Sequence, residues 1–80
     1  MTAQIFVTMK KTVLDPQGQT IQRALNSMGH PEVVSVRQGK YFEIELNGLD
    51  RPAAEATISK LAEEVLSNPV IEQFRFEILD

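Results

Sequence analysis

Hydrophobic and polar residues alternate through the middle of the chain, on both sides of the dipeptide Gln38-Gly39. One face of this stretch carries Val34, Val36, Phe42, Ile44 and Leu46. A period of two is typical of a β-sheet with one buried face. Because glycine accepts the positive φ of a tight turn, residues 34–46 are predicted to form two strands joined at Gln38-Gly39. Asn-Gly or Asp-Gly would be a stronger turn signal, so one long bent strand shared with a second chain is the alternative.

The same period predicts a strand near the N-terminus and another near the C-terminus. Residues 4–10 alternate between apolar and polar side chains, and residues 73–78 do the same. The side chains expected to face the core from these two strands are Ile5, Val7, Met9, Phe74, Phe76 and Ile78. Both strands would therefore share their buried face with the central stretch.

Two helices are predicted from a helical period and from signals at their ends. Asp15-Pro16 begins the first, because aspartate caps free N–H groups and proline loses no hydrogen bond there, and Gly29 ends it. Asp50 and Pro52 repeat the start signal, and Asn68-Pro69 ends the second helix. The apolar stripes are Ile21, Ala24, Leu25 and Met28, then Ala54, Ile58, Leu61, Ala62 and Val65.

The predicted order is strand, helix, strand, strand, helix, strand. This order is typical of an α+β ferredoxin-like (βαββαβ) two-layer sandwich, an antiparallel sheet with two helices on one face. Eighty residues make one domain, residues 1–80, with a modest core. Because the chain has no cysteine for a disulfide, association with another chain is the most economical further source of stability.

Strand parity leaves a second sheet face that carries both charges, two aromatic rings and a valine. Its members are Phe6, Thr8, Lys10, Val33, Ser35, Arg37, Tyr41, Glu43, Glu45, Gln73, Arg75 and Glu77. This face is either solvated and laced with cross-strand ion pairs, or an interface with a second copy or a larger partner. Tyrosine and arginine favour interfaces, which makes the second interpretation the preferred one.

Composition argues against several classes of function. The net charge of −3 argues against nucleic acid as the main partner, and the single histidine with no cysteine argues against a metal site. No apolar run approaches a membrane span, and Met1-Thr2-Ala3-Gln4 does not begin a signal peptide. We therefore expect a cytoplasmic protein without membrane or nucleic-acid partners.

A search for catalytic chemistry finds no promising constellation. The serines have no histidine at a suggestive spacing, His30 lies beside helix-ending residues, and no phosphate-binding glycine motif is present. The acidic pairs 43/45 and 63/64 lie on polar faces and are expected to be solvated. Gly18 is unusual in the first turn of a helix and indicates either a close approach of another backbone or an anion, or simple tolerance in a fraying turn.

Three loop clusters are richer in special residues than plain turns require. They are Val13-Leu14-Asp15-Pro16-Gln17-Gly18, Val36-Arg37-Gln38-Gly39-Lys40 and Asn68-Pro69-Val70-Ile71-Glu72. In this order, spacing and chain length they resemble the PurS family, the small subunit of phosphoribosylformylglycinamidine (FGAM) synthase. The junction Met28-Gly29-His30-Pro31 is less typical of that family but lies in a loop.

The resemblance implies a bridging subunit in de novo purine biosynthesis. In that family the chain docks a glutaminase subunit (PurQ) onto a large synthetase subunit (PurL), forms a homodimer or higher oligomer, and supports ammonia transfer. The complex converts formylglycinamide ribonucleotide, glutamine and ATP to FGAM, so the chain counts as an accessory subunit of a glutamine-dependent ligase. By this resemblance it would have no catalytic residues and bind no cofactor, while the large subunit uses ATP and Mg²⁺.

The clusters supply hypothetical partner-docking residues. These are Asp15, Gln17, Gly18, Arg37, Lys40, Asn68 and Glu72. Arg37 and Lys40 could contact either partner protein or ligand phosphate. A free-standing ferredoxin-like module that binds a small regulatory ligand is the alternative function, although beyond Asp15 and Gly18 the sequence shows no dedicated polar pocket for one.

Overall fold

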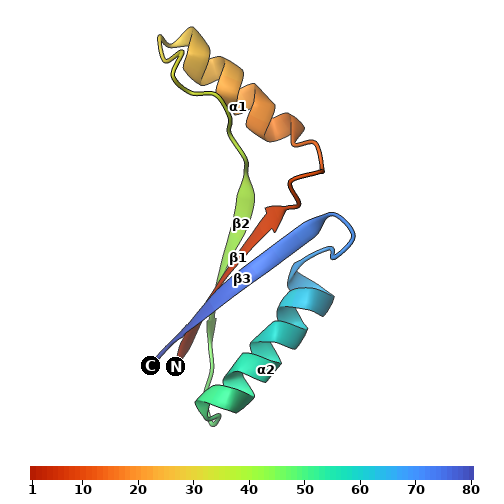
Figure 1. Cartoon of the computed structure of the whole chain (residues 1–80). Coiled ribbons are helices and arrows are strands. Elements are labelled where there is room, and N and C mark those ends of the chain that lie inside the picture. The colour runs from red at the N-terminus through yellow and green to blue at the C-terminus, as the bar shows by residue number, and fades with distance from the viewer.

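Three strands form one antiparallel sheet with the order β2-β1-β3. The computed structural model describes all 80 residues, in an elongated shape of 50 × 26 × 14 Å (Figure 1). Its elements are β1 (Thr2–Met9), α1 (Pro16–Ser27), β2 (Gly39–Glu45), α2 (Arg51–Leu61), η1 (Ala62–Leu66) and β3 (Glu72–Leu79). The α+β class agrees with the prediction, and so does the order of elements except that the strand expected before Gln38 is absent.

The predicted strand parity is confirmed along β1, β2 and β3. Ile5 and Val7 of β1 are fully buried, and the inward side chains of β2 and β3 are buried or half-buried. Helix α2 covers this face of the sheet, with Ile58 fully buried against the strands (Figure 1). Only nine of the 80 residues are buried, so the core of the single chain is thin.

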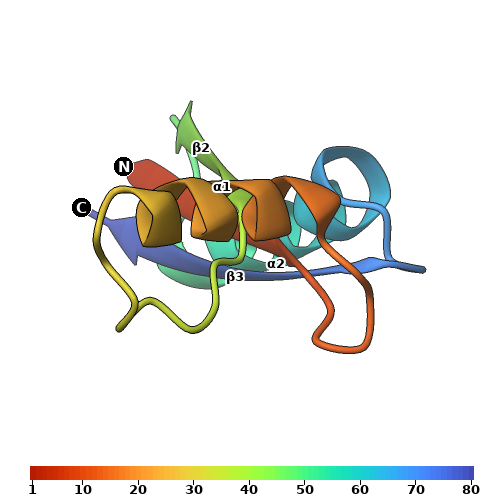
Figure 2. The same cartoon turned by 90° about the horizontal axis from the view of Figure 1, so that it is seen from above.

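Helix α1 does not cover the sheet, contrary to the expectation that both helices lie on one face. It lies beyond the end of the sheet, and in Figure 2, which looks down on the molecule, it is the element nearest the viewer. Its stripe is exposed as a result: Ile21 is 39% exposed and Met28 is 72% exposed. We call residues 10–38, which comprise α1 and its two connections, the arm.

The predicted hairpin at Gln38-Gly39 is wrong. Gly39 has no positive φ, and it begins β2 as a continuation of the extended segment before it. That segment runs back beside α1, where Nδ2 of Asn26 donates to the carbonyl oxygens of His30 (2.9 Å) and Val33 (3.0 Å). Val34, expected to be buried, is 81% exposed because no strand of this chain pairs with its segment.

The ends of both helices follow the predicted signals, with one addition. Asp50 caps α2 by accepting from the amide of Ala53 (2.9 Å), and Gly29 follows α1 with φ 95°. The second helix was predicted to continue as one α-helix through Val65. Its last turn is instead a π-helix, η1. There both the amide (3.0 Å) and the hydroxyl (2.7 Å) of Ser67 donate to the carbonyl oxygen of Ala62, five residues earlier.

Candidate functional site

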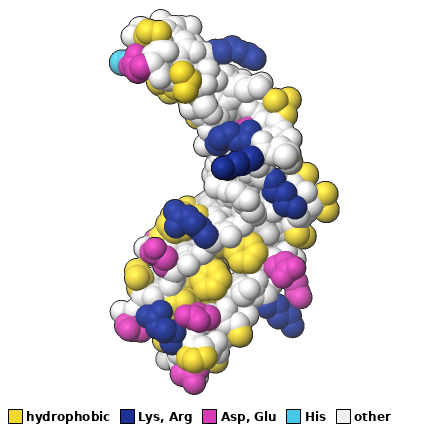
Figure 3. Space-filling model, viewed as in Figure 1, with side chains coloured by type: hydrophobic (Ala, Val, Ile, Leu, Met, Phe, Trp, Pro, Cys, Tyr) yellow, Lys and Arg dark blue, Asp and Glu magenta, His cyan; other side chains and the backbone are white.

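Three connections meet where the arm joins the sheet, and together they form the candidate site. They lead from β1 into α1, from the arm into β2, and from η1 into β3. A hollow of about 240 Å³ lies between them, lined by Met9, Asp15, Gln17, Gln38, Gly39, Lys40 and Glu72. Figure 3 shows Lys and Arg side chains gathered around this narrow waist, whereas most of the Asp and Glu side chains visible in this view lie below it, where the sheet and α2 are.

Asp15 ties the start of α1 to the start of β2. One carboxylate oxygen accepts from the amide of Gly18 (2.9 Å) and the other from the amide of Gln38 (2.7 Å). The Gln38 and Gly18 amides and the nearby Arg37 guanidinium hold the pKa of Asp15 below its ordinary value. The side chain is buried, 4% exposed, and fully engaged within the chain.

Gly18 is required by close packing against the returning segment of the arm. A Cβ at this position would lie 2.8 Å from Oδ2 of Asp15 and 3.0 Å from the carbonyl carbon of Val36. The interpretation as a close approach of another backbone is therefore confirmed, and tolerance in a fraying turn is wrong. The backbone that approaches belongs to the same chain.

Arg37 stabilises the connection between β1 and α1. Its Nη2 donates to the carbonyl oxygens of Lys10 (2.9 Å) and Val13 (2.8 Å). These contacts fix the loop on which Asp15 sits, although the arginine itself is exposed. Asp15, Gly18 and Arg37 thus form one joint, which we call the arm joint.

Lys40, Asn68 and Glu72 form a second set of contacts across the hollow. The Lys40 ammonium lies 3.3 Å from Oε2 of Glu72 and donates to the carbonyl oxygen of Leu66 (3.3 Å). Oε1 of Glu72 accepts from the amide of Asn68 (2.7 Å), and Oδ1 of Asn68 accepts from the amide of Val70 (3.1 Å). This network holds the turn before β3, on which Val70 is 77% exposed.

The structure therefore brings all seven predicted site residues to one end of the sheet. Gln17 lines the hollow at the start of α1, and the other six are joined by the contacts described above. Whether any of the seven docks a partner stays a prediction. Met9 and Gln38 also line the hollow and were missed, because Met9 has the parity of a core residue and Gln38 acts through its backbone.

The outer sheet face, away from α2, lacks the cross-strand ion pairs considered from the sequence. Lys40–Glu72, Arg51–Asp80 and His30–Glu32 are the ion pairs of the chain, and none crosses this face. The Arg75 guanidinium instead lies 4.0 Å from the ring centroid of Phe6, and that ring lies 5.1 Å from the ring of Tyr41. Arg37 and Arg75 contact backbone carbonyls and an aromatic ring instead, and no carboxylate on this face forms an ion pair.

No group of three His, Asp or Glu side chains is placed to hold a metal ion. His30 is half-exposed at the tip of the arm, where its ring bonds to Glu32 (2.9 Å), far from the hollow. Neither helix has the length and apolar character needed to cross a membrane.

Comparisons with known proteins cover almost the whole chain. Residues 2–80 match the family model PurS, described as phosphoribosylformylglycinamidine (FGAM) synthase. The FGAM synthase subunit PurS of Bacillus subtilis is 41% identical over 75 residues, 94% of this chain and 88% of that subunit. PurS of Methanocaldococcus jannaschii is 33% identical over 76 residues, 95% of this chain and 92% of that subunit.

Solved structures agree with the sequence matches. A crystal form of Bacillus subtilis PurS has a TM-score of 0.89 at 39% identity and covers 99% of this chain and 98% of its own. A chain in the structure of PurLQS from Thermotoga maritima has a TM-score of 0.88 at 32% identity and covers 98% of this chain and 95% of its own. The resemblance and the ferredoxin-like fold class are confirmed. This chain belongs to the PurS family, the small subunits of FGAM synthase.

Proposed function

We propose that this chain is the non-catalytic bridging subunit of an FGAM synthase complex, docking a glutaminase subunit onto a large synthetase subunit and supporting ammonia transfer. The structure of PurLQS from Thermotoga maritima supports this role, because one of its chains has the same fold over 98% of this chain. In this assignment the chain acts in the cytoplasm, while ATP and Mg²⁺ are bound by the large subunit.

The proposal rests on one observation: the polar residues of the candidate site bond to groups of their own chain. Asp15 and Glu72 each accept from two donors of the chain, and the Lys40 ammonium is shared between a carbonyl and a carboxylate. General acid–base or nucleophilic catalysis needs a group that can reach a substrate atom. Here these groups hold loops in place, which suits a docking subunit better than a reaction centre.

We further propose that a second copy of the chain covers the exposed surface of the arm. A helix of 12 residues is marginal by itself, and α1 exposes Ile21 and Met28. Phe42 and Ile44 on β2 are only half-buried on the face that a second helix would cover. The outer edge of β2 is unpaired, so the segment 33–38 of another chain has an edge to join.

This exchange would restore the complete two-helix, four-stranded arrangement across two chains. The extended segment of one arm would supply the fourth strand, and its α1 would cover β2 of the other chain. Replacing Met28 by Asp should convert the dimer to monomer in sedimentation velocity, because a charge would enter the covered stripe. Replacing the exposed Ser27 by Asp is the matched control, and dimers that persist equally in both variants would refute the exchange.

The bridging role is tested by reconstitution. We expect the purified chain to co-elute with both larger subunits and to be required for glutamine-dependent FGAM formation. The double variant Arg37→Ala/Lys40→Ala should weaken this assembly while the isolated domain keeps its circular dichroism spectrum, because both side chains hold loops rather than the core. Full synthase activity without the chain would refute the bridging role.

A further inference from the structure

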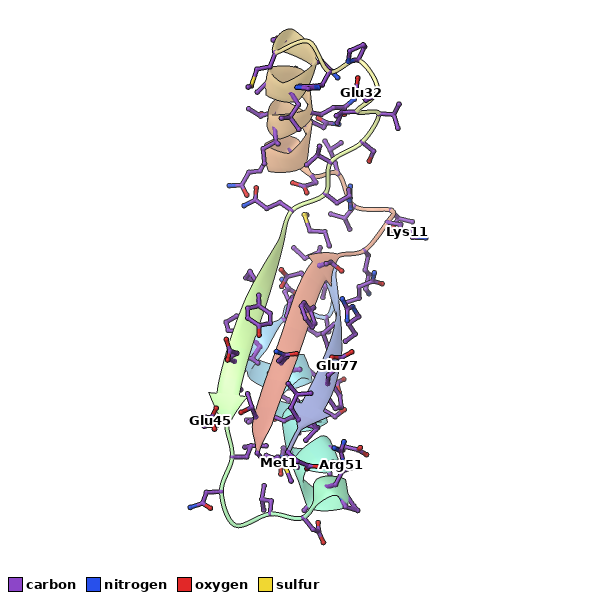
Figure 4. All side chains as sticks on the ribbon, turned by 90° about the vertical axis from the view of Figure 1, so that its left-hand side faces the viewer. Met1, Lys11, Glu32, Glu45, Arg51 and Glu77 are labelled. Atoms are coloured by element: carbon purple, nitrogen blue, oxygen red, sulfur yellow. The ribbon has the colours of Figure 1, made fainter.

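The Asn47-Gly48 dipeptide lies in the connection between β2 and α2, at the end of the sheet opposite the arm. In Figure 4 this connection leaves β2 beyond Glu45, passes below the sheet and enters α2 at Arg51, whereas Lys11 lies at the other end. Both residues of the dipeptide are exposed, and Gly48 has φ 80°. A Cβ on Gly48 would meet no atom within 4 Å, so open space surrounds the backbone here.

Asparagine followed by glycine can react with its own main chain. The main-chain nitrogen of the glycine attacks the side-chain carbonyl carbon and forms the new C–N bond of a five-membered succinimide, while the side-chain nitrogen leaves as ammonia with the displaced proton. Water then adds to one of the two ring carbonyls and opens the ring, giving aspartate or, where the main chain passes through Cβ, isoaspartate. Glycine favours the attack because it has no Cβ to obstruct the nitrogen and leaves the backbone free to rotate.

No other group of the chain holds the two reacting groups of this dipeptide. Neither the Gly48 amide nor the side chain of Asn47 has a hydrogen-bond partner in the chain. The connection is fixed only on either side, where the amide of Leu46 donates to the carbonyl oxygen of Met1 (2.8 Å) and Asp50 caps α2. Closing the succinimide ring therefore breaks no hydrogen bond.

The other two asparagines are protected, each in a different way. Nδ2 of Asn26 donates to two carbonyl oxygens of the arm (2.9 and 3.0 Å), and the nitrogen that would attack its side chain belongs to Ser27 within α1. Asn68 is followed by Pro69, whose nitrogen has no proton to lose. Of the three asparagines, only Asn47 combines a free side chain with a free amide on the next residue.

We propose that Asn47 is a modification site, converted slowly and without an enzyme through a succinimide to aspartate and isoaspartate. Ammonia leaves, water is taken up, and the net charge becomes one unit more negative than −3. The isoaspartate product adds one atom to the main chain shortly before Asp50, the cap of the helix that covers the sheet. We therefore expect it to loosen the start of α2 while the buried Ile58 stays packed.

The two products differ in their effect on α2. Aspartate adds a negative charge near the N-terminus of the helix, where the helix dipole favours one. Isoaspartate carries the same charge but shifts the main chain that places Asp50. The Asp50 side chain accepts from the amide of Ala53 (2.9 Å), and its carbonyl oxygen accepts from the amide of Ala54 (2.9 Å). These two amides therefore distinguish the added main-chain atom from the added charge.

Peptide mass spectrometry measures the reaction in the full chain, incubated in neutral to mildly alkaline buffer before digestion. Cleavage after lysine and arginine places the three asparagines in separate peptides, so Asn26 and Asn68 are controls within the same molecule. Asn47 should be converted at least tenfold faster than either, because Asn26 reacts only after local opening of the arm and Asn68 lacks the attacking N–H. An isoaspartate-specific methyltransferase with a labelled methyl donor should then mark the incubated chain.

The matched control is Asn47→Gln, which keeps the amide but would have to close a larger ring. This variant should show neither the conversion nor the methyl label. Conversion of Asn47 no faster than that of Asn26, or equal methyl labelling of the variant and the wild type, would overturn the proposed site.

Hydrogen exchange tests the effect on α2. The isoaspartate form, separated by chromatography, should exchange the Ala53 and Ala54 amides at least threefold faster than the unreacted chain. Freshly purified Asn47→Asp should exchange them no faster than the unreacted chain. Equal protection in all three forms would overturn the effect on α2. Because neither measurement involves the larger subunits, such a failure leaves the bridging role standing.

Discussion

Replacing Gly18 by alanine is the sharpest test of the arm joint. The added methyl group would meet the Asp15 carboxylate at 2.8 Å and the carbonyl carbon of Val36 at 3.0 Å, and it would lie closer still to the Val36 carbonyl oxygen. Two of these three atoms belong to the backbone, so they cannot move aside as the end of a flexible side chain can. The returning segment of the arm must therefore shift away from α1.

Two opposing effects set the size of the change. Alanine is favoured over glycine within a helix by at most about 1 kcal/mol. Forcing an extra methyl group into a closely packed site is unfavourable by about 1–3 kcal/mol. Because the obstacle is backbone, we expect the steric effect to win by about 1–2 kcal/mol, which lowers the melting temperature of a domain of this size by roughly 5–15 °C.

The measurement combines thermal unfolding by circular dichroism with hydrogen exchange at fixed protein concentration, because association changes apparent stability. If the joint opens locally, the amides of Gly18 and Gln38 should lose protection even when the sheet melts as before. Gln19→Ala, one exposed residue further along the same helical turn, should stay within about 0.5 kcal/mol of the wild type. A Gly18→Ala chain with equal or higher stability and unchanged amide protection would refute the joint.

Three further predictions concern individual side chains. Hydrogen bonds lower the pKa of Asp15 in the folded chain, so its contribution is complete above the unfolded pKa of about 3.9 and is lost as the pH falls through the lower folded value. Protection of the Gln38 amide should show that acid step, and Asp15→Asn should abolish it. Burial first, and then the charge of Glu43, raise the pKa of Tyr41, the only tyrosine. Its phenolate absorbance should therefore titrate above about 10, and Glu43→Gln should lower the midpoint. Lys40→Ala should release the turn before β3 to faster exchange but change unfolding by less than about 1 kcal/mol, because the lysine is half-exposed. Unchanged exchange at the Val70 amide would contradict this.

Local features of the fold could be predicted from the sequence, because they depend on near neighbours. Aspartate followed by proline placed the start of α1, and Gly29 placed its end. Strand parity identified the buried side chains of β1 as Ile5 and Val7, because a period of two leaves only one choice of face. None of these inferences requires knowing which chain supplies the opposite surface.

The position of α1 could not be predicted in the same way. An amphipathic stripe shows that a helix face needs cover, but a stripe in one chain is identical whether the cover comes from that chain or from another. The backbone at Gln38-Gly39 could not be predicted for a similar reason, because glycine can adopt both an extended conformation and a tight turn. In the structure the backbone is extended, and both the arm and the edge of β2 remain uncovered.

The candidate site shows a comparable limit. Asp15, Arg37 and Lys40 were singled out as residues that grip a partner, because charged groups clustered in loops suggest contact with one. In the structure each is bonded to backbone or side-chain groups of its own chain. Sequence spacing can bring such residues to one end of a sheet, but their hydrogen-bond partners depend on loop paths that spacing does not fix.

These internal contacts indicate that the polar residues set the direction of the arm. A projecting arm is useful for assembly only if its direction is set before the partner arrives, since ordering it on binding would weaken the complex. Asp15 and Arg37 fix that direction with four hydrogen bonds at the base of the arm. In the proposed assembly, contact with a second copy is then left to the apolar stripe of α1 and the uncovered edge of β2. Variants of the joint should therefore weaken assembly by leaving the direction of the arm unset, while variants of those surfaces should weaken it by removing contact area.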